Sequence, residues 1–337
     1  MAKQTNPAKK YVNEEISRLS SMDSRYDELS AKARNLNLLA LQGKLAPVFH
    51  REAEIEAIQK MLLRRTKPNA LLVGPAGCGK TAIAEALAIF LSKTKVEWLS
   101  AQAQADRDYD RAYEKWRNNP ANFTPDTGEV IVPAPTRTEV PKHPLCEAVI
   151  YDLSMNSLVA GTKYRGEFEE KLQGIINACK RDANIILFID EIHQMNEIGS
   201  SEGSTGMGQI LKPALARAEV RVIGATTTEE SAILKKDKAL ARRFSDVEIR
   251  PLVGEKAIST AESILRDYEK FHSVSVAEVT AEQILEMVTF HVGGIFPNNF
   301  IDAIDEAMSG ARFDGKTSIG LREIKQTLSR MTGNIIL

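Results

Sequence analysis

The stretch "NALLVGPAGCGKTAIAEALA", residues 69–88, decides the fold. Residues 69–74 form a short apolar run that ends in glycine, and the residues that follow the loop are rich in helix formers. The stretch therefore predicts a strand, a glycine-rich loop and a helix. Within it, "GPAGCGKT" fits the phosphate-binding pattern G-x-x-x-x-G-K-[ST], in the strand-to-helix context that this pattern requires.

The side chains and glycines of this loop suit a nucleoside triphosphate. The glycines let backbone N–H groups turn toward phosphate oxygens, Lys80 can neutralise charge on the β- and γ-phosphates, and Thr81 can bind Mg²⁺. The sequence therefore predicts ATP and Mg²⁺ as cofactors. Cys78 occupies a variable position of the pattern and is interpreted as a filling residue rather than a nucleophile. The residues expected to form the loop site are Gly74, Pro75, Ala76, Gly77, Cys78, Gly79, Lys80 and Thr81.

Strand and helix patterns alternate after the loop. Apolar runs at 148–153, 184–190 and 220–227 predict strands, and residues 166–181 predict a helix with one apolar face. This alternation predicts an α/β fold with a P-loop and a doubly wound parallel sheet. From residue 254 onward the patterns are helical alone, which predicts a second, all-helical domain.

The domain division expected from these patterns has three parts. Residues 1–40 form a helical lead-in, residues 41–253 the α/β domain, and residues 254–337 the small helical domain. An insertion at residues 95–147 interrupts the α/β pattern, and six of the chain's 13 prolines lie between Pro120 and Pro144. In it, aromatic residues recur at helical spacing and a turn is expected at 126–128. The insertion is either an ordinary surface elaboration or an element that docks a partner.

Two adjacent carboxylates follow a buried strand in "IILFIDEIH", residues 185–193. Because a buried strand does not end in unpaired charges without a reason, we expect Asp190 to hold Mg²⁺ and Glu191 to polarise an attacking water as general base. Taken alone, the pair could also be a helix cap beside a solvated acid.

Further candidates follow the next strand. Thr227 ends that strand, at the sheet edge where the γ-phosphate is expected. Arg242 and Arg243, in "ALARRFSDV", carry guanidinium groups suited to developing phosphoryl charge, although a surface ion pair is the alternative.

Composition excludes several classes of protein. The chain has 44 basic and 45 acidic residues, so its net charge of −1 gives no reason to expect nucleic acid or an anionic membrane as partner. No apolar run approaches the roughly 20 residues that span a bilayer. Its three cysteines are widely spaced and suggest neither disulfides nor a zinc site. We expect a cytoplasmic protein that does not contact the membrane.

In this order, the motifs resemble the AAA+ superfamily, and in finer detail the first nucleotide-binding domain of the Clp unfoldases and disaggregases. The two predicted domains would then be the AAA+ large domain and its lid. The resemblance is carried by residues 42–88, by "LVAGTKYRGEFEEKL", "LFIDEIH", "LKPALARAEVRVIGATT" and "KALARRF", and more weakly by "FPNNFIDAIDEA".

This resemblance implies a homo-oligomeric ring, usually of six subunits. Arg242 and Arg243 would reach the nucleotide of the neighbouring subunit, and Val48 and Phe49 would flank the adenine. The tetrad Lys163-Tyr164-Arg165-Gly166 would line a central channel, where Tyr164 would grip a polypeptide substrate. Residues 199–206 occupy the place of the family's second channel loop.

The chain also departs from the family. It has Gly294 and Asn299 where the family's lid pattern has Arg and Lys, so nucleotide sensing by the lid is expected to differ. Within these residues we expect neither the family's separate N-terminal docking domain nor its second ATPase domain, and the insertion at 95–147 has no recognised counterpart.

Three functions are compatible with these patterns. The leading hypothesis is a ring-forming ATPase that unfolds, remodels or threads protein substrates. The second is an ATP-driven nucleic-acid motor or loader, against which the near-neutral charge argues. The third is a regulatory assembly factor in which ATP holds a ring together, against which Glu191 argues.

Overall fold

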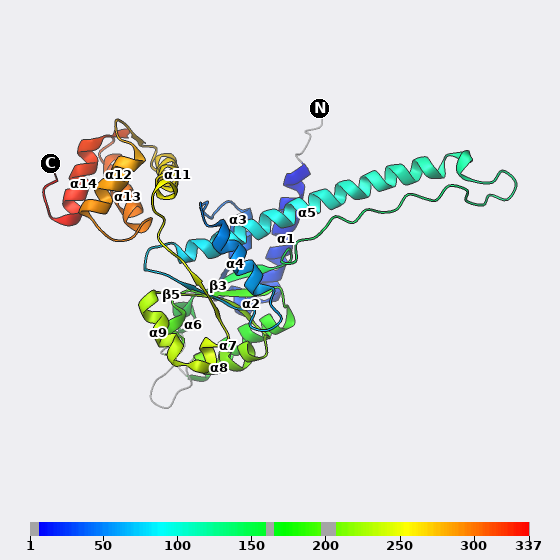
Figure 1. Cartoon of the computed structure of the whole chain (residues 1–337), viewed down its shortest axis with the longest axis horizontal. Helices are drawn as coiled ribbons and strands as arrows, with labels where there is room; N and C mark the ends of the chain where they lie inside the picture. The colour runs from blue at the N-terminus through cyan, green and yellow to red at the C-terminus, as the bar shows by residue number, and fades with distance from the viewer. Residues whose placement is uncertain (1–6, 160–164, 197–206, 337) are drawn as a thin grey trace.

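A six-stranded sheet forms the centre of the large domain in the computed structural model, which describes residues 7–159, 165–196 and 207–336 (Figure 1). The strand order is β1-β3-β4-β5-β2-β6, and all strands but β1 are parallel to their neighbours. This confirms the predicted parallel α/β fold. The strands are β1 (Ala33–Asn35), β2 (Ala70–Val73), β3 (Val149–Leu153), β4 (Ile185–Ile189), β5 (Arg221–Thr226) and β6 (Ser245–Glu248).

The apolar runs of the sequence become strands because both faces of the sheet are covered. In β4, Ile185, Leu187 and Ile189 pack into one core cluster, whereas Ile186 and Phe188 pack into a second on the opposite face. The helices of this domain are α1 (Pro7–Arg25), α2 (Asp27–Ser30), α3 (Leu36–Leu41), α4 (Glu52–Leu62), α5 (Lys80–Arg117), α6 (Met155–Val159), α7 (Arg165–Arg181), α8 (Met207–Ala216), α9 (Thr228–Lys236) and α10 (Lys238–Ala241), with 3₁₀ turns at Pro120–Asn122 and Ile192–Asn196.

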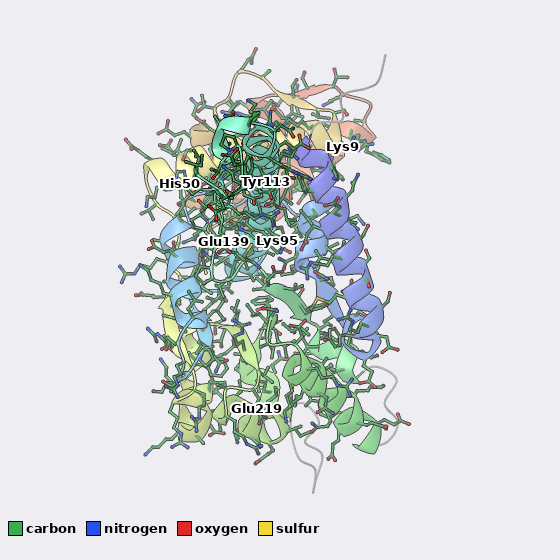
Figure 2. All side chains as sticks on the ribbon, turned by 90° about the vertical axis from the view of Figure 1, so that its right-hand side faces the viewer. Lys9, His50, Lys95, Tyr113, Glu139 and Glu219 are labelled. Carbon is green, nitrogen blue, oxygen red and sulfur yellow. The ribbon has the colours of Figure 1, made fainter. Side chains whose placement is uncertain are left out.

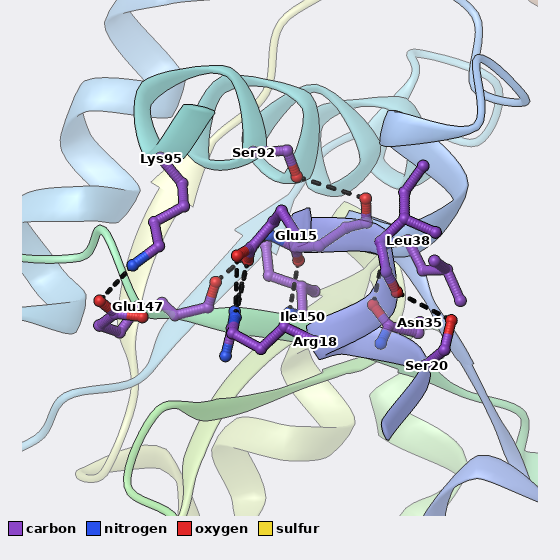
Figure 3. A network of polar contacts seen from close by, with 12 residues as sticks. Glu15, Arg18, Ser20, Asn35, Leu38, Ser92, Lys95, Glu147 and Ile150 are labelled. Atoms are coloured by element: carbon purple, nitrogen blue, oxygen red, sulfur yellow. Dashed lines mark hydrogen bonds and ion pairs between the residues drawn. The ribbon is translucent and has the colours of Figure 1, made fainter. Parts of the chain in front are cut away.

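The lead-in segment adds more than the predicted helices. Its strand β1 pairs antiparallel with β3 at the edge of the sheet. Polar side chains then fasten the segment in place (Figure 3): the Asn37 carboxamide oxygen accepts from the Ile150 N–H at 2.8 Å, and the Ser92 hydroxyl donates to the Asn37 carbonyl at 3.4 Å. Close by, Lys95 pairs with Glu147 across the root of the insertion. The lead-in is therefore packed against the large domain.

The insertion begins as an uninterrupted continuation of the P-loop helix. Helix α5 runs from Lys80 to Arg117, but its buried residues end at Val96, beyond which it leaves the body of the protein (Figure 1). We call residues 98–142 the arm. The predicted break at residue 95 is therefore a change of environment and not a change of secondary structure.

Ring contacts hold the two limbs of the arm together. Tyr113 lies between Tyr109 and Trp116, with ring centroids 5.9 and 5.5 Å away, and Trp116 also contacts Phe123 at 5.2 Å. The Trp116 indole N–H donates to the Val132 carbonyl at 2.8 Å. This confirms the helical spacing of the aromatics. In Figure 2, which views the molecule from the side toward which the arm projects, Tyr113 lies in the upper half of the molecule.

A hairpin closes the arm at its tip. The Thr124 N–H donates to the Glu129 carbonyl at 2.8 Å, Phe123 pairs antiparallel with Val130, and Gly128 adopts φ +68°. The predicted turn at 126–128 is confirmed. Three consecutive apolar residues on the return limb, Val130, Ile131 and Val132, are exposed.

The lid has its own core, centred on Phe300, Ile284 and Leu328. It is helical as predicted, with one addition: β7 (Ser275–Val276) and β8 (Ser318–Ile319) form a short parallel pair. Its helices are α11 (Glu255–His272), α12 (Ala281–His291), α13 (Asn298–Phe313) and α14 (Leu321–Thr332).

Candidate functional site

The glycine-rich loop lies between the end of β2 and the start of α5, as the pattern predicts. Gly77 and Gly79 have φ of +79° and +91°, a region that L-residues with side chains rarely adopt. At Gly74 a Cβ would come within 2.3 Å of the Ile249 carbonyl oxygen, so the close approach of the residue that follows β6 also requires glycine. The Lys80 ammonium donates to the carbonyls of Gly74 and Pro75 at 3.0 and 2.9 Å.

A cavity of about 500 Å³ opens beside this loop, at the carboxyl ends of the parallel strands. Most of the predicted catalytic and cofactor residues come together in its wall, which supports the predicted site geometry. The predicted residues that line it are Ala76, Gly77, Gly79, Lys80, Thr81, Asp190, Glu191 and Thr227.

Other predicted residues lie outside this lining: Gly74, Pro75, Cys78, Val48, Phe49, Arg242 and Arg243. Gly74 and Pro75 act through their carbonyls on Lys80. Cys78 is fully buried in the core, and burial raises the pKa of its thiol, which agrees with a filling residue. The adenine contacts of Val48 and Phe49 stay a prediction.

The carboxylates after β4 meet the first turn of α5. The Thr81 hydroxyl donates to an Asp190 oxygen at 2.5 Å, and the other Asp190 oxygen accepts from the Glu191 N–H at 2.9 Å. Hydroxyl and carboxylate oxygens are the ligands that Mg²⁺ prefers. Because the described residues contain no cluster of three or more His, Cys, Asp or Glu, an ion here would take its remaining ligands from phosphate and water.

Glu191 is held in an unusual backbone conformation. Its φ is +49°, a region that costs a non-glycine residue energy and that is often found at functional sites. The Gln194 amide donates to a Glu191 carboxylate oxygen at 2.7 Å, which orients this exposed side chain. Sequence reasoning missed Gln194.

Glu230 joins the end of β5 to the segment after β4. The Thr227 hydroxyl donates to a Glu230 oxygen at 2.8 Å and accepts from the Glu230 N–H at 3.1 Å, which caps helix α9. The buried His193 lies 3.2 Å from the same Glu230 oxygen and 3.1 Å from the Thr226 hydroxyl. The helix-start pattern of Thr227 and an acid three residues later could have revealed Glu230.

The lid contributes one wall of the cavity through Pro297, Asn298 and Ile301. A Cβ on Gly77 would lie 3.0 Å from the Asn298 Cβ, so the loop and the lid are in close contact. Asn299, at the position that drew attention in the sequence, is buried and donates to the Gly293 carbonyl at 2.7 Å instead. The neighbouring Asn298 is the lid amide at the cavity.

A second cavity, of about 600 Å³, adjoins the first and shares Thr81, Asp190 and Glu191 with it. Here Arg34 of β1 pairs with Asp152 at 2.5 Å and lies 4.0 Å from Glu85 of α5. Burial raises the pKa of the Glu85 carboxyl, and Arg34 opposes this rise. Sequence reasoning missed Arg34 and Glu85, because neither belongs to a recognisable motif.

The arginines and the channel tetrad lie elsewhere. Arg242 is exposed at the end of α10, and Arg243 follows it. Neither lines the cavity of its own chain. Lys163 and Tyr164 lie outside the described residues, as do residues 199–206, and Arg165 and Gly166 begin helix α7.

The family model "ATPase family associated with various cellular activities (AAA)" matches residues 70–252, more than half of the chain. The chain belongs to the AAA ATPase family. The match covers the P-loop, both carboxylates and the arginine pair, so the resemblance seen in the sequence is confirmed.

AAA relatives of known name extend the comparison. The chain is 37% identical over 308 residues to the chaperone protein ClpB of Aquifex aeolicus, which covers 90% of this chain and 26% of that protein. Among solved structures, an Hsp104–ADP complex from S. cerevisiae matches with a TM-score of 0.68 and 29% identity, covering 91% of this chain and 46% of that one. An Hsp104–casein complex in an extended conformation matches with a TM-score of 0.66 and 27% identity, over 91% and 45% of the two chains. The chain thus spans about a quarter of that ClpB and under half of those Hsp104 chains.

Among the helices that the structure describes, none is both long and apolar enough to cross a membrane.

Proposed function

We propose that this AAA protein is a Mg²⁺-dependent ATPase that converts ATP and water to ADP and phosphate. The observation that carries the proposal is the convergence of the P-loop, Thr81, Asp190 and Glu191 on one cavity. Loop N–H groups and Lys80 would bind the phosphates, and Thr81 and Asp190 would hold the metal. When bound, Mg²⁺ neutralises charge on the β- and γ-phosphates. Glu191 would accept a proton from the attacking water, and Thr227 would contact the γ-phosphate.

The same proposal includes a ring in which the active site is shared between subunits. Its support is the position of Arg242 and Arg243, which lie outside the cavity lining of their own chain although guanidinium groups suit the transition-state charge. Similarity to ClpB and Hsp104 makes a homo-hexamer the expected assembly.

Mixing two inactive variants tests the shared site. Glu191→Gln lacks the base and Arg243→Ala lacks the guanidinium, so neither is expected to hydrolyse ATP alone. In mixed rings some sites would combine an intact base with a neighbour's intact arginine, and a measurable fraction of activity should return. If mixing restores nothing although the variants co-assemble, the arginine does not act between subunits.

For the work done by hydrolysis, we propose remodelling or threading of protein substrates. Support comes from the similarity to a structure of Hsp104 with casein and from the tetrad at 163–166. We expect an unfolded polypeptide to stimulate hydrolysis, and Tyr164→Ala to keep hydrolysis but lose remodelling. Stimulation by single-stranded DNA alone would favour the nucleic-acid motor. A Glu191→Gln protein that assembles and keeps its full biological function would favour the regulatory factor.

The arm is the element that we expect to recruit a specific partner. Contacts between its aromatic rings hold the exposed Val130, Ile131 and Val132 away from the large domain, where these three side chains contribute nothing to a core. Removal of residues 100–140, with a short linker in their place, should leave basal hydrolysis but abolish partner-dependent stimulation. The cytoplasmic location stays a prediction.

A further inference from the structure

Two neighbouring residues before helix α4, His50 and Arg51, extend to different parts of the molecule. Arg51 is 5% exposed, and its guanidinium donates to the carbonyls of Cys78 at 3.0 Å and Arg250 at 2.9 Å, and to Glu54 at 2.8 Å. Cys78 belongs to the P-loop, and Arg250 lies in the linker between β6 and the lid. One rigid, planar group therefore holds the phosphate-binding loop and the start of the linker.

His50 contacts the lid itself. Its Nε2 lies 2.7 Å from the Ser259 hydroxyl oxygen, one turn into helix α11. The Ser259 hydroxyl also lies 3.0 Å from the Glu255 carbonyl, to which it donates. Its oxygen is then the acceptor, and His50 donates an Nε2–H to it. A neutral His50 makes this bond as its Nε2–H tautomer.

This contact is distinctive at the boundary between the domains. Between pairs of residues that the structure describes, no other hydrogen bond or ion pair joins residues 41–249 to the lid. The rest of the boundary includes Ile295, which packs on the core of the large domain, and the approach of Asn298 to Gly77. His50 has φ +59°, a conformation unfavourable for any residue with a side chain, and here the side chain makes the cross-domain bond.

We infer that His50, Arg51 and Ser259 form a latch that couples the position of the lid to the P-loop and thereby sets nucleotide affinity. The inference rests on the proposed ATP site. With the latch made, the lid presents Pro297 and Asn298 at the cavity. Because coupling between two equilibria is reciprocal, bound nucleotide must favour the His50–Ser259 contact by the same factor as the contact favours nucleotide.

Nucleotide binding in a double-mutant cycle tests the latch. The parent is Glu191→Gln, to prevent hydrolysis, and the variants are His50→Gly, Ser259→Ala and both together. A fluorescent ATP analogue with Mg²⁺ is titrated into each, and ADP release is timed by stopped flow. Ser263→Ala is the matched control, since its hydroxyl lies one turn further along α11 and bonds only the Ser259 carbonyl at 2.9 Å.

Each single variant should bind the analogue about three- to tenfold more weakly and release ADP faster, the range expected for loss of one hydrogen bond. The double variant should be no weaker than the worse single variant, because both remove the same contact. His50→Gly also relieves the backbone, whereas Ser259→Ala leaves it alone, so agreement between the two assigns the effect to the bond.

Additive effects, or a Ser259→Ala protein within twofold of its parent while the parent binds nucleotide, would overturn the latch alone. A parent that binds no nucleotide would overturn the proposed function, and the latch with it. A Ser263→Ala protein as weak as Ser259→Ala would show that α11 responds to any lost hydroxyl, which also contradicts a specific contact.

Discussion

The phosphate-binding site, at the carboxyl ends of the strands, and the arm are stabilised in different ways, although helix α5 belongs to both. At the phosphate-binding site, strands buried on both faces fix the positions of Asp190 and Thr227, and left-handed glycines shape the loop. In the arm, rings on successive turns of one helix contact each other and the return limb, without a core. A precise site thus depends on distant parts of the chain, whereas a projecting element depends on local spacing.

Substitution of the general base Glu191 should have the largest effect on hydrolysis, and this effect should be confined to the phosphate-binding site. Glu191→Gln is expected to lower kcat by roughly 10²- to 10⁴-fold, because the amide cannot accept the water's proton, while ATP binding persists. Steady-state hydrolysis and nucleotide titration measure both. Glu229→Gln, an exposed acid of α9 outside the cavity lining, is the control. Near-normal hydrolysis by Glu191→Gln would remove this residue from the mechanism.

Trp116→Ala should affect the arm alone. Its ring contacts and its bond to the Val132 carbonyl are lost, so amide hydrogen exchange at residues 120–132 should accelerate about tenfold. Hydrolysis should stay within twofold of wild type. The exposed Glu139 supplies the control, Glu139→Ala. Unchanged exchange in Trp116→Ala would show that these ring contacts do not hold the hairpin.

Arg34→Ala tests whether strand β1 of the lead-in segment stabilises the carboxylates beside the phosphate-binding site. Burial raises the folded-state pKa of the Glu85 carboxyl. The folded state therefore loses stability as pH rises through that pKa and Glu85 ionises, and the nearby Arg34 charge offsets part of this loss. The variant loses both the ion pair with Asp152 and the compensation of Glu85, and should cost about 0.5–1 kcal/mol of stability at neutral pH, a small value because Arg34 is mostly exposed; the part that depends on Glu85 should decrease in acid as this carboxyl is protonated.

Urea unfolding at pH 7.5 and pH 4.5 measures the loss in Arg34→Ala. The control is Lys60→Ala, which breaks an exposed pair with Glu56 away from the site. A loss that grows on acidification would contradict the proposed compensation of Glu85.

The smallest effect is expected at Cys78, although it lies inside the loop. Cys78→Ala should hydrolyse ATP within twofold of wild type, because the thiol is buried and faces away from the cavity lining. Since burial raises the pKa of the thiol, native Cys78 should resist iodoacetamide at pH 8 and react only after denaturation. Peptide mass spectrometry separates it from Cys146 and Cys179. Rapid labelling of the native protein would reopen a reactive role.

Much of the phosphate-binding site and of the strands that form it could be predicted from the sequence, because local patterns and tertiary structure agree there. The strands expected at 69–74, 148–153, 184–190 and 220–227 appear within one or two residues of these positions, and the apolar face of α7, from Phe168 to Cys179, is buried as predicted. The cavity residues that were missed, Glu85, Glu230 and Asn298, are brought in by helix packing and lid closure. The contacts of Glu85 and Asn298 are long-range and are not encoded by their sequence neighbours, whereas Glu230 bonds Thr227 three residues earlier and could have been found from the helix-start pattern.

Two errors about the elements share a physical origin. Residues 33–35 have no strand pattern and become β1 only because β3 offers a free edge. The start of the insertion was placed at residue 95 because the apolar periodicity of α5 ends where the helix leaves the core, although the helix itself continues to Arg117.

The continuity of α5 makes the arm a lever. Its 38 residues contain neither glycine nor proline, so a rod about 57 Å long extends from Lys80 and Thr81 to Arg117 without a flexible point. A force applied at the hairpin is transmitted along the same backbone that presents the phosphate-binding lysine. Conversely, a small tilt of the helix about its P-loop end moves the distant tip through a larger arc. Whatever grips the tip is thus mechanically connected to the chemistry at the other end.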